Sequence, residues 1–151
     1  ERVVVVDRAP VRPAVARTLG ADLAIEPEQL PELRAFAPLG FDLIAEATGV
    51  PAVLESTVEF ARPGGTVWVF GVAPEDAYAR IAPYQLFRRD LSLVGSFAVN
   101  RTMAPAVALI RSGAVRVEPL VSHVLPIDRF AEGMELAEHD PERMKVQFGW
   151  E

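Results

Sequence analysis

An acidic residue stands directly after a β-branched run near the start of the sequence: Asp7 follows Val3-Val4-Val5-Val6. A carboxylate accepts hydrogen bonds from two vicinal hydroxyl groups at once. In dinucleotide-binding folds an acid at the end of the second strand binds the adenosine ribose in this way, and its charge disfavours the 2′-phosphate of NADP. The other interpretation is that Asp7 only caps the turn that follows. Asp7 is therefore a candidate ribose ligand that favours NAD.

Few other residues have the chemistry of a catalytic or metal site. The sequence has no cysteine and two histidines, which excludes disulfides, thiolate zinc sites and a cysteine nucleophile within this stretch. We expect His123 to be structural and His139 to interact with the dipole of a helix end. Glu46, late in a strand, is interpreted as a hydrogen-bonded structural carboxylate more readily than as a functional acid. No catalytic residue and no metal ligand is assigned.

Charge and composition narrow the class of partner. The chain has 151 residues, of which 50% are hydrophobic, and 15 Lys and Arg stand against 21 Asp and Glu, for a net charge of −6. This balance argues against nucleic acid or an anionic membrane surface as the main partner. No apolar run approaches the ~20 residues of a membrane helix, and no signal peptide is evident, so a cytoplasmic protein is expected.

The elements that must position Asp7 alternate between strand and helix. Apolar runs and Pro and Gly boundaries predict strands at residues 2–7, 22–25, 41–47, 66–70, 91–97, 120–125 and 145–150. Helices are predicted at residues 10–20, 32–36, 51–61, 83–89, 102–112 and 128–139, the last capped by Asp128. Such alternation is typical of parallel βαβ units, so we predict an α/β fold with a doubly wound parallel (Rossmann) sheet.

This sheet is expected to be incomplete at its N-terminus. The Gly-rich turn that should precede Asp7 is absent from the sequence. The first strand, which leads into that turn, is missing with it, and in the strand order 3-2-1-4-5-6 this strand lies in the middle of the sheet. Unpaired buried backbone groups there would cost about 1–3 kcal/mol each. We therefore predict that the chain is the C-terminal part of a longer protein. Residues 1–119 would be a partial dinucleotide-binding domain, and residues 120–151 a segment that returns to a catalytic domain.

The order of short motifs along the whole chain resembles the medium-chain dehydrogenase/reductase superfamily. Within it, the sequence is most similar to the zinc-dependent alcohol dehydrogenase group, in its polyol (sorbitol-type) and threonine dehydrogenase branch. The similar segments are Val3-Val4-Val5-Val6-Asp7-Arg8, Arg12, Leu19-Gly20-Ala21-Asp22, Phe41-Asp42, Glu46-Ala47-Thr48-Gly49, Arg62-Pro63-Gly64-Gly65-Thr66, Phe70-Gly71, Leu93-Val94-Gly95-Ser96-Phe97, Val117-Glu118-Pro119-Leu120-Val121-Ser122-His123, Pro126, Phe130-Ala131-Glu132-Gly133 and Lys145-Val146.

The resemblance implies a set of residues that bind the cofactor. Asp7 would bind the adenosine ribose, with Arg8 and Arg12 beside it. Other positions would line the groove, border the nicotinamide ring or meet its carboxamide: Ala47, Thr48 and Val50; Gly71 and Val72; and Ser96, Phe97 and Ala98. Lys145 would sit at the pyrophosphate, and Arg143 fits the same slot if the final strand slips by two residues.

The resemblance also implies an activity: hydride transfer between a secondary alcohol or polyol and NAD. Zinc would be held by Cys, His and Glu residues of a separate N-terminal domain and not by this stretch, which alone would be inactive. A homo-oligomer, dimer or tetramer, is expected. The alternatives are a zinc-independent quinone or enoyl reductase of the same superfamily, a methyltransferase, which the tail from Val117 to Trp150 disfavours, and a non-catalytic nucleotide-binding remnant.

Overall fold

A computed structural model describes residues 2–99 and 101–150. The chain divides into two compact units. One unit contains the chain up to Leu30 and from Arg101 onwards, and the other contains the chain between them. Each unit is built of parallel strands joined by helices, so the predicted α/β class is confirmed. Within the described part of the chain, no helix is both long and apolar enough to cross a membrane.

The first unit opens with a parallel βαβ element. Strand β1 (Val4–Val6) pairs with β2 (Leu23–Ile25), and α1 (Val11–Thr18) connects them. Ala24 and Ile25 of β2 are buried, and the Arg17 guanidinium of α1 donates to the Ala24 carbonyl. The helix is thereby fixed on this two-stranded sheet, and the carboxyl end of β1 points Asp7 out of the strand.

The C-terminal part of the first unit repeats the pattern. Helix α5 (Met103–Arg111) precedes β6 (Val121–Pro126), which pairs in parallel with β7 (Lys145–Gly149). Helix α6 (Phe130–His139) connects these strands and packs on both. Its Gly133 is buried against the Phe148 ring, where an added methyl group would collide with the ring.

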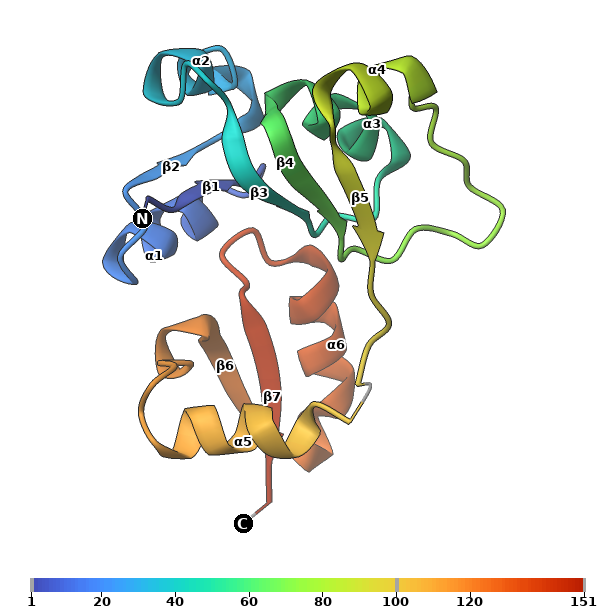
Figure 1. The fold of residues 1–151 in the computed structure, drawn as a ribbon. Coiled ribbons are helices and arrows are strands. Elements are labelled where there is room, and N and C mark those ends of the chain that lie inside the picture. Colours follow the sequence, from blue (N-terminus) through green and yellow to red (C-terminus); the bar gives the residue numbers. More distant parts are fainter. Residues whose placement is uncertain (1, 100, 151) are drawn as a thin grey trace. The chain divides into compact units, whose positions relative to one another are not determined.

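The second unit is a three-stranded parallel sheet in the order β3-β4-β5 (Figure 1). It begins with the short helix α2 (Glu32–Phe36). Strand β3 (Phe41–Glu46) is followed by α3 (Pro51–Phe60) and β4 (Ala61–Val69), and α4 (Pro83–Arg89) leads to β5 (Ser92–Gly95). Its buried apolar side chains are Leu33, Val58, Ala61 and Val67.

Every predicted strand and helix is present, with two differences in detail. Pro63-Gly64-Gly65 lies inside β4 rather than before it, because the pairing of β3 and β4 shifts register between Phe41↔Ala61 and Leu43↔Thr66. Helix α6 follows a short 3₁₀ turn at Ile127–Arg129 and has Arg129 at its N-cap, so the predicted Asp128 cap is wrong.

The arrangement of the strands agrees with the predicted incomplete sheet. The strands form three separate sheets, β1-β2, β3-β4-β5 and β6-β7. Neighbouring strands must lie about 4.8 Å apart to share hydrogen bonds. A continuous doubly wound sheet would need a strand that pairs with both β1 and β3, and none of the described residues supplies it.

Candidate functional site

Asp7 lies at the carboxyl end of β1, where its N–H donates to the Ile25 carbonyl (3.1 Å). Its carboxylate accepts a hydrogen bond from the Ala9 N–H (2.9 Å) and forms an ion pair with Arg12 (3.2 Å), and 26% of the side chain is exposed. Asp7 thus caps the turn that follows β1. An ionised carboxylate has about four acceptor positions, so Asp7 retains capacity for the hydroxyls of a ligand. Arg8 follows it on the surface.

Most of the other predicted cofactor residues gather at one edge of the second unit. Ala47 and Thr48 follow the end of β3, Gly71 closely follows β4, and Ser96 follows β5. Since all three strands run parallel, their carboxyl ends lie at the same edge of the sheet. That edge is where α/β proteins bind their ligands.

Glu46, the last residue of β3, connects two of these turns. Its side chain is only 3% exposed. The carboxylate accepts from the N–H of Thr48 (2.6 Å), from the Thr48 hydroxyl and from the N–H of Gly49 (3.2 Å). Its main-chain carbonyl accepts from the N–H groups of Phe70 (2.9 Å) and Gly71 (2.7 Å). The interpretation of Glu46 as a hydrogen-bonded structural carboxylate is confirmed.

Two glycines allow these turns to meet. Gly49 has φ +70°, and a methyl group there would lie 2.6 Å from the Val72 carbonyl carbon. A methyl group on Gly71 would lie 2.8 Å from the Thr48 nitrogen. Real Cβ atoms do not approach backbone atoms this closely, so both positions require glycine. The turns enclose a cavity of about 130 Å³, lined among others by Glu46, Gly49, Val50, Leu54, Gly71 and Ala73.

The turn after β5 is linked to β4 by a side chain. The indole N–H of Trp68 donates to the Ser96 hydroxyl (2.9 Å), and the Trp68 ring meets that of Phe70 edge-on, with centroids 4.9 Å apart. Phe97 is 88% exposed, and Ala98 beside it is also exposed. Ser96 is therefore positioned from within the sheet, while the two residues after it face outward.

Lys145 belongs to a different sheet. It is the first residue of β7, paired with Val121 of β6, and its side chain is exposed. The alternative residue, Arg143, uses its guanidinium to donate to the Asp140 carbonyl (2.7 Å) in the turn after α6. Asp7, Arg8, Arg12 and Lys145 lie in the first unit, whereas Ala47, Thr48, Val50, Gly71, Val72, Ser96, Phe97 and Ala98 lie in the second.

Sequence reasoning missed two contributors to this site. Gly49 was not predicted as a site residue, although a Thr-Gly pair directly after a strand is a signal for a tight turn. Trp68 was not predicted as a site residue either, because its hydrogen bond to Ser96 joins two residues that lie far apart in sequence.

The residues present do not fit a zinc ion. His123 lies 3.1 Å from the Asp140 carboxylate and 2.9 Å from the Ser122 hydroxyl, and His139 lies 3.6 Å from Glu135. Over residues 2–99 and 101–150 there is no group of three His, Cys, Asp or Glu side chains that could hold a metal. Both histidines are thus placed in local pairs with carboxylates.

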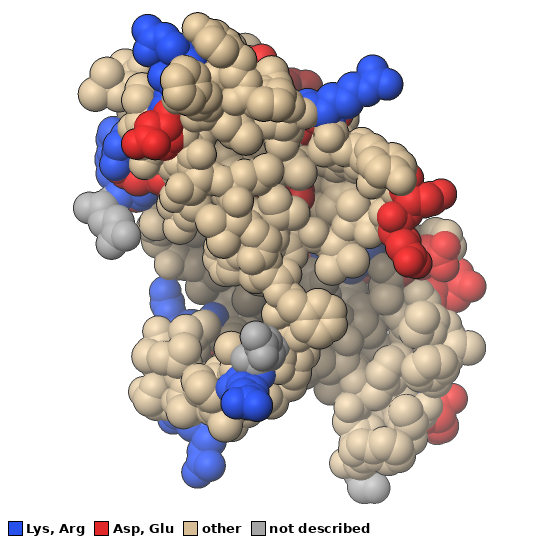
Figure 2. Space-filling model, turned by 45° about the vertical axis from the view of Figure 1, so that its right-hand side comes forward, with Lys and Arg blue, Asp and Glu red and all other residues tan. Residues whose placement is uncertain are grey.

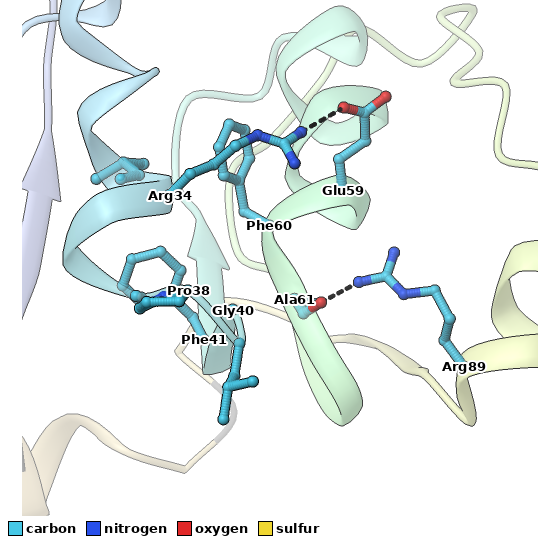
Figure 3. A pocket seen from close by; sticks show the side chains of 11 residues that line it. Arg34, Pro38, Gly40, Phe41, Glu59, Phe60, Ala61 and Arg89 are labelled. Atoms are coloured by element: carbon cyan, nitrogen blue, oxygen red, sulfur yellow. Dashed lines mark hydrogen bonds and ion pairs between the residues drawn. The ribbon is translucent and has the colours of Figure 1, made fainter.

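A second cavity, of about 190 Å³, lies beside the start of β3 and the end of α3 (Figure 3). Arg34 pairs with Glu59 across it (3.8 Å), and Arg89 donates to the carbonyls of Val58 (2.9 Å) and Ala61. None of the predicted cofactor residues lines this cavity. Its arginines are engaged in holding α2, α3 and α4 to the sheet.

A family model described as zinc-binding dehydrogenase matches residues 2–112. The chain belongs to this family. The resemblance to medium-chain zinc-dependent dehydrogenases is thereby confirmed.

Individual relatives in this family show the same similarity over part of their length. The chain is 40% identical over 111 residues to the D-altritol 5-dehydrogenase of Agrobacterium fabrum (strain C58 / ATCC 33970), covering 74% of this chain and 33% of that protein. It thus spans about a third of this relative.

Two solved structures share the fold. A protein from Sinorhizobium meliloti 1021 bound to NADP superimposes with a TM-score of 0.87 at 24% identity, covering 96% of this chain and 44% of the other. A short chain alcohol dehydrogenase from Escherichia coli CFT073 complexed with NADH gives a TM-score of 0.86 at 23% identity, covering 97% and 44%. These similarities show the fold of this chain.

Proposed function

We propose that this chain is the cofactor-binding part of an NAD-linked, zinc-dependent alcohol or polyol dehydrogenase. The observation that carries the proposal is Asp7, a partly exposed carboxylate at the carboxyl end of a strand in a parallel βαβ element. Family membership supports it. Since the chain spans about a third of its curated relative, the catalytic activity belongs to a larger protein.

The bound cofactor would accept a hydride from the alcohol carbon, and this chain's own residues would bind and orient it. Asp7 would accept hydrogen bonds from the two adenosine ribose hydroxyls, with Arg12 holding the carboxylate in place (3.2 Å). The turns at Gly49 and Gly71 would present backbone groups, because neither has a Cβ to keep a ligand away. Ser96, fixed by Trp68, would meet the carboxamide.

We propose NAD rather than NADP as the cofactor. The Asp7 carboxylate would lie close to a 2′-phosphate and repel it, and the nearest guanidinium, that of Arg12, is already paired with Asp7. The substrate class, a polyol or secondary alcohol, rests on the 40% identity to D-altritol 5-dehydrogenase.

The test is a titration of the full-length protein and its Asp7→Ala variant with NADH and NADPH, followed by cofactor fluorescence. Loss of charge-assisted hydrogen bonds should weaken NADH binding about 10- to 100-fold, and NADPH binding should improve relative to NADH. Asp22→Asn is the control, because the Asp22 carboxylate accepts a hydrogen bond from the Val3 N–H (2.7 Å) and is not part of the turn after β1. Tighter NADPH than NADH binding by the unaltered protein would favour the zinc-independent reductase instead.

We also propose a homo-oligomer. All four residues of β5 are exposed, including Leu93 and Val94, and an uncovered strand edge favours pairing with another chain. On the face drawn in Figure 2, uncharged side chains predominate and the Lys and Arg side chains are scattered. Light scattering of the full-length protein should give a mass of two or four chains, and a monomer at micromolar concentration would contradict this proposal.

A further inference from the structure

Glu46 is a buried carboxylate beside the turns that hold most of the predicted cofactor residues, and its side-chain oxygens are directed at donors of the chain itself. Its side chain is 3% exposed, and its oxygens are occupied by donors from Thr48 and Gly49. A buried carboxylate is costly unless such donors compensate it. The burial of this carboxylate is therefore explained by its hydrogen bonds to Thr48 and Gly49.

What Glu46 holds is two turns from different strands. The carboxylate binds the Thr48-Gly49 turn after β3, and the main-chain carbonyl binds the N–H groups of Phe70 and Gly71 after β4. These hydrogen bonds continue to the start of α3, because the Thr48 hydroxyl that donates to Glu46 also accepts from the Val50 N–H (3.1 Å). Helix α3 begins at the residue after Val50.

We propose that Glu46 is a positioning residue whose side chain sets cofactor affinity by fixing the Thr48-Gly49 turn, against which Gly71 packs. The inference rests on the proposed function, since it assigns Glu46 a role in the same groove. A turn held in its binding conformation before the ligand arrives loses less freedom on binding. The Glu46 side chain thus acts on the cofactor through the Thr48-Gly49 turn.

Glutamine is the informative replacement because it keeps the shape and changes the donors. Oε1 of Glu46 accepts from Thr48 and Gly49, and Oε2 lies 3.3 Å from the Gly49 nitrogen. An amide –NH₂ in place of either oxygen would set a donor against an N–H donor. The Thr48-Gly49 turn should then open more often while the strands remain paired.

The experiment compares Glu46→Gln with the unaltered full-length protein. NADH Kd and cofactor KM should both rise about tenfold, the effect of losing one or two hydrogen bonds to a charged group. The kcat at saturating cofactor should change less than twofold, because Glu46 does not reach the reacting atoms. In the cofactor-free protein, amide hydrogen exchange at Thr48 and Gly49 should accelerate, whereas Gly71, whose N–H donates to the main-chain carbonyl of residue 46, and Val67 within β4 should keep their protection.

Val58→Ala is the matched control for stability alone. Val58 is buried in the same unit (6% exposed) but does not line the cavity at the turns. It should lower the Tm and leave NADH Kd within twofold. Thr48→Val is the second variant if Glu46→Gln does not fold. It removes the hydroxyl that donates to Glu46 and should also weaken NADH binding. In the double variant with Glu46→Gln, the loss of binding free energy should be smaller than the sum of the two single losses.

The outcomes separate the two proposals. Failure of the unaltered full-length protein to bind NADH or NADPH would overturn the proposed function. Normal binding by the unaltered protein, with an equal NADH Kd in Glu46→Gln or, if that variant does not fold, in Thr48→Val, would overturn the role of Glu46 alone. So would a weakening of NADH binding that Val58→Ala reproduces at the same loss of Tm.

Discussion

The two edges of the three-stranded sheet β3-β4-β5 are held together by different kinds of contact. At the carboxyl edge, backbone N–H groups converge on one buried carboxylate, and two glycines bring the main chains of separate turns together. At the amino edge, long arginine side chains reach across a cavity to carbonyls and to an exposed carboxylate. Close backbone approach occurs at both edges, since a methyl group on Gly40 at the amino edge would lie 2.7 Å from the Phe60 carbonyl oxygen. What differs is the buried carboxylate at the first edge and the arginine side chains at the second.

The difference matters for what each edge tolerates. Backbone packed against backbone cannot adjust to an added atom, whereas a long exposed side chain moves aside at little cost. We expect substitutions at the carboxyl edge, where most of the predicted cofactor residues lie, to affect cofactor binding. The amino edge should affect stability alone.

The largest effect is expected at Gly49. In Gly49→Ala the methyl group collides with the Val72 carbonyl, and the residue must also keep φ +70°. Left-handed strain of about 1–2 kcal/mol and overpacking of about 1–3 kcal/mol together predict a loss of about 3 kcal/mol in unfolding free energy. NADH binding should become undetectable. Urea unfolding and cofactor fluorescence measure the two effects.

Gly64→Ala is the matched control for this prediction. Gly64 has nearly the same conformation, φ +72°, but its added methyl group would meet only the flexible Arg62 side chain at 3.4 Å. The Gly64→Ala variant should lose about 1–2 kcal/mol of unfolding free energy from backbone strain alone, and it should bind NADH normally. Equal losses in the two variants would mean that close packing of the turns contributes nothing, and the contrast between the edges would fail.

An intermediate effect is expected at Arg89. Its guanidinium donates to two carbonyls near the end of α3, those of Val58 and Ala61. Arg89→Ala should reduce the unfolding free energy by about 1–3 kcal/mol, since the carbonyls lose a charged donor, and leave NADH Kd unchanged. Arg88→Ala, at an exposed neighbour in α4, should change stability by no more than about 0.5 kcal/mol. A changed Kd in Arg89→Ala would show that the amino edge also takes part in binding.

In both units, local features were predictable from sequence. The strand before Asp7 is a run of valines, and the turn after β3 is marked by Thr48-Gly49. Apolar runs and turn residues therefore located each element. Asp7 was predicted as a site residue because its chemistry depends only on standing at a strand end. Glu46 was interpreted as a structural carboxylate from its place late in a strand.

Features set by the pairing of distant strands were not predictable. Pro63-Gly64-Gly65 is a turn signal by composition, but the register shift between β3 and β4 places it inside β4. The hydrogen bonds from the N–H groups of Phe70 and Gly71 to the Glu46 carbonyl likewise form only because β3 and β4 run side by side. Local sequence carries no information on register between strands joined through a helix.

The smallest effect is expected for the exposed pair Asp42 and Arg62, which joins β3 to β4. Arg62 donates to the Asp42 carboxylate (2.6 Å), and this hydrogen bond and the positive charge lower the pKa of Asp42 below its usual 3.8. A carboxyl whose pKa is lowered by folding stabilises the fold above its unfolded pKa, and the contribution disappears as pH falls through the folded value, below 3.8.

Because Asp42 is fully exposed to solvent, the pair should contribute little. Asp42→Asn should therefore leave the Tm at pH 7 and NADH Kd unchanged within error. Carbon NMR titration of the Asp42 carboxyl should show the lowered pKa, and Arg62→Ala or 0.5 M salt, which screens exposed charges, should return it toward 3.8. A loss of stability in Asp42→Asn as large as that in Arg89→Ala would show that exposed pairs, and not only the buried-carbonyl contacts of Arg89, hold the amino edge together.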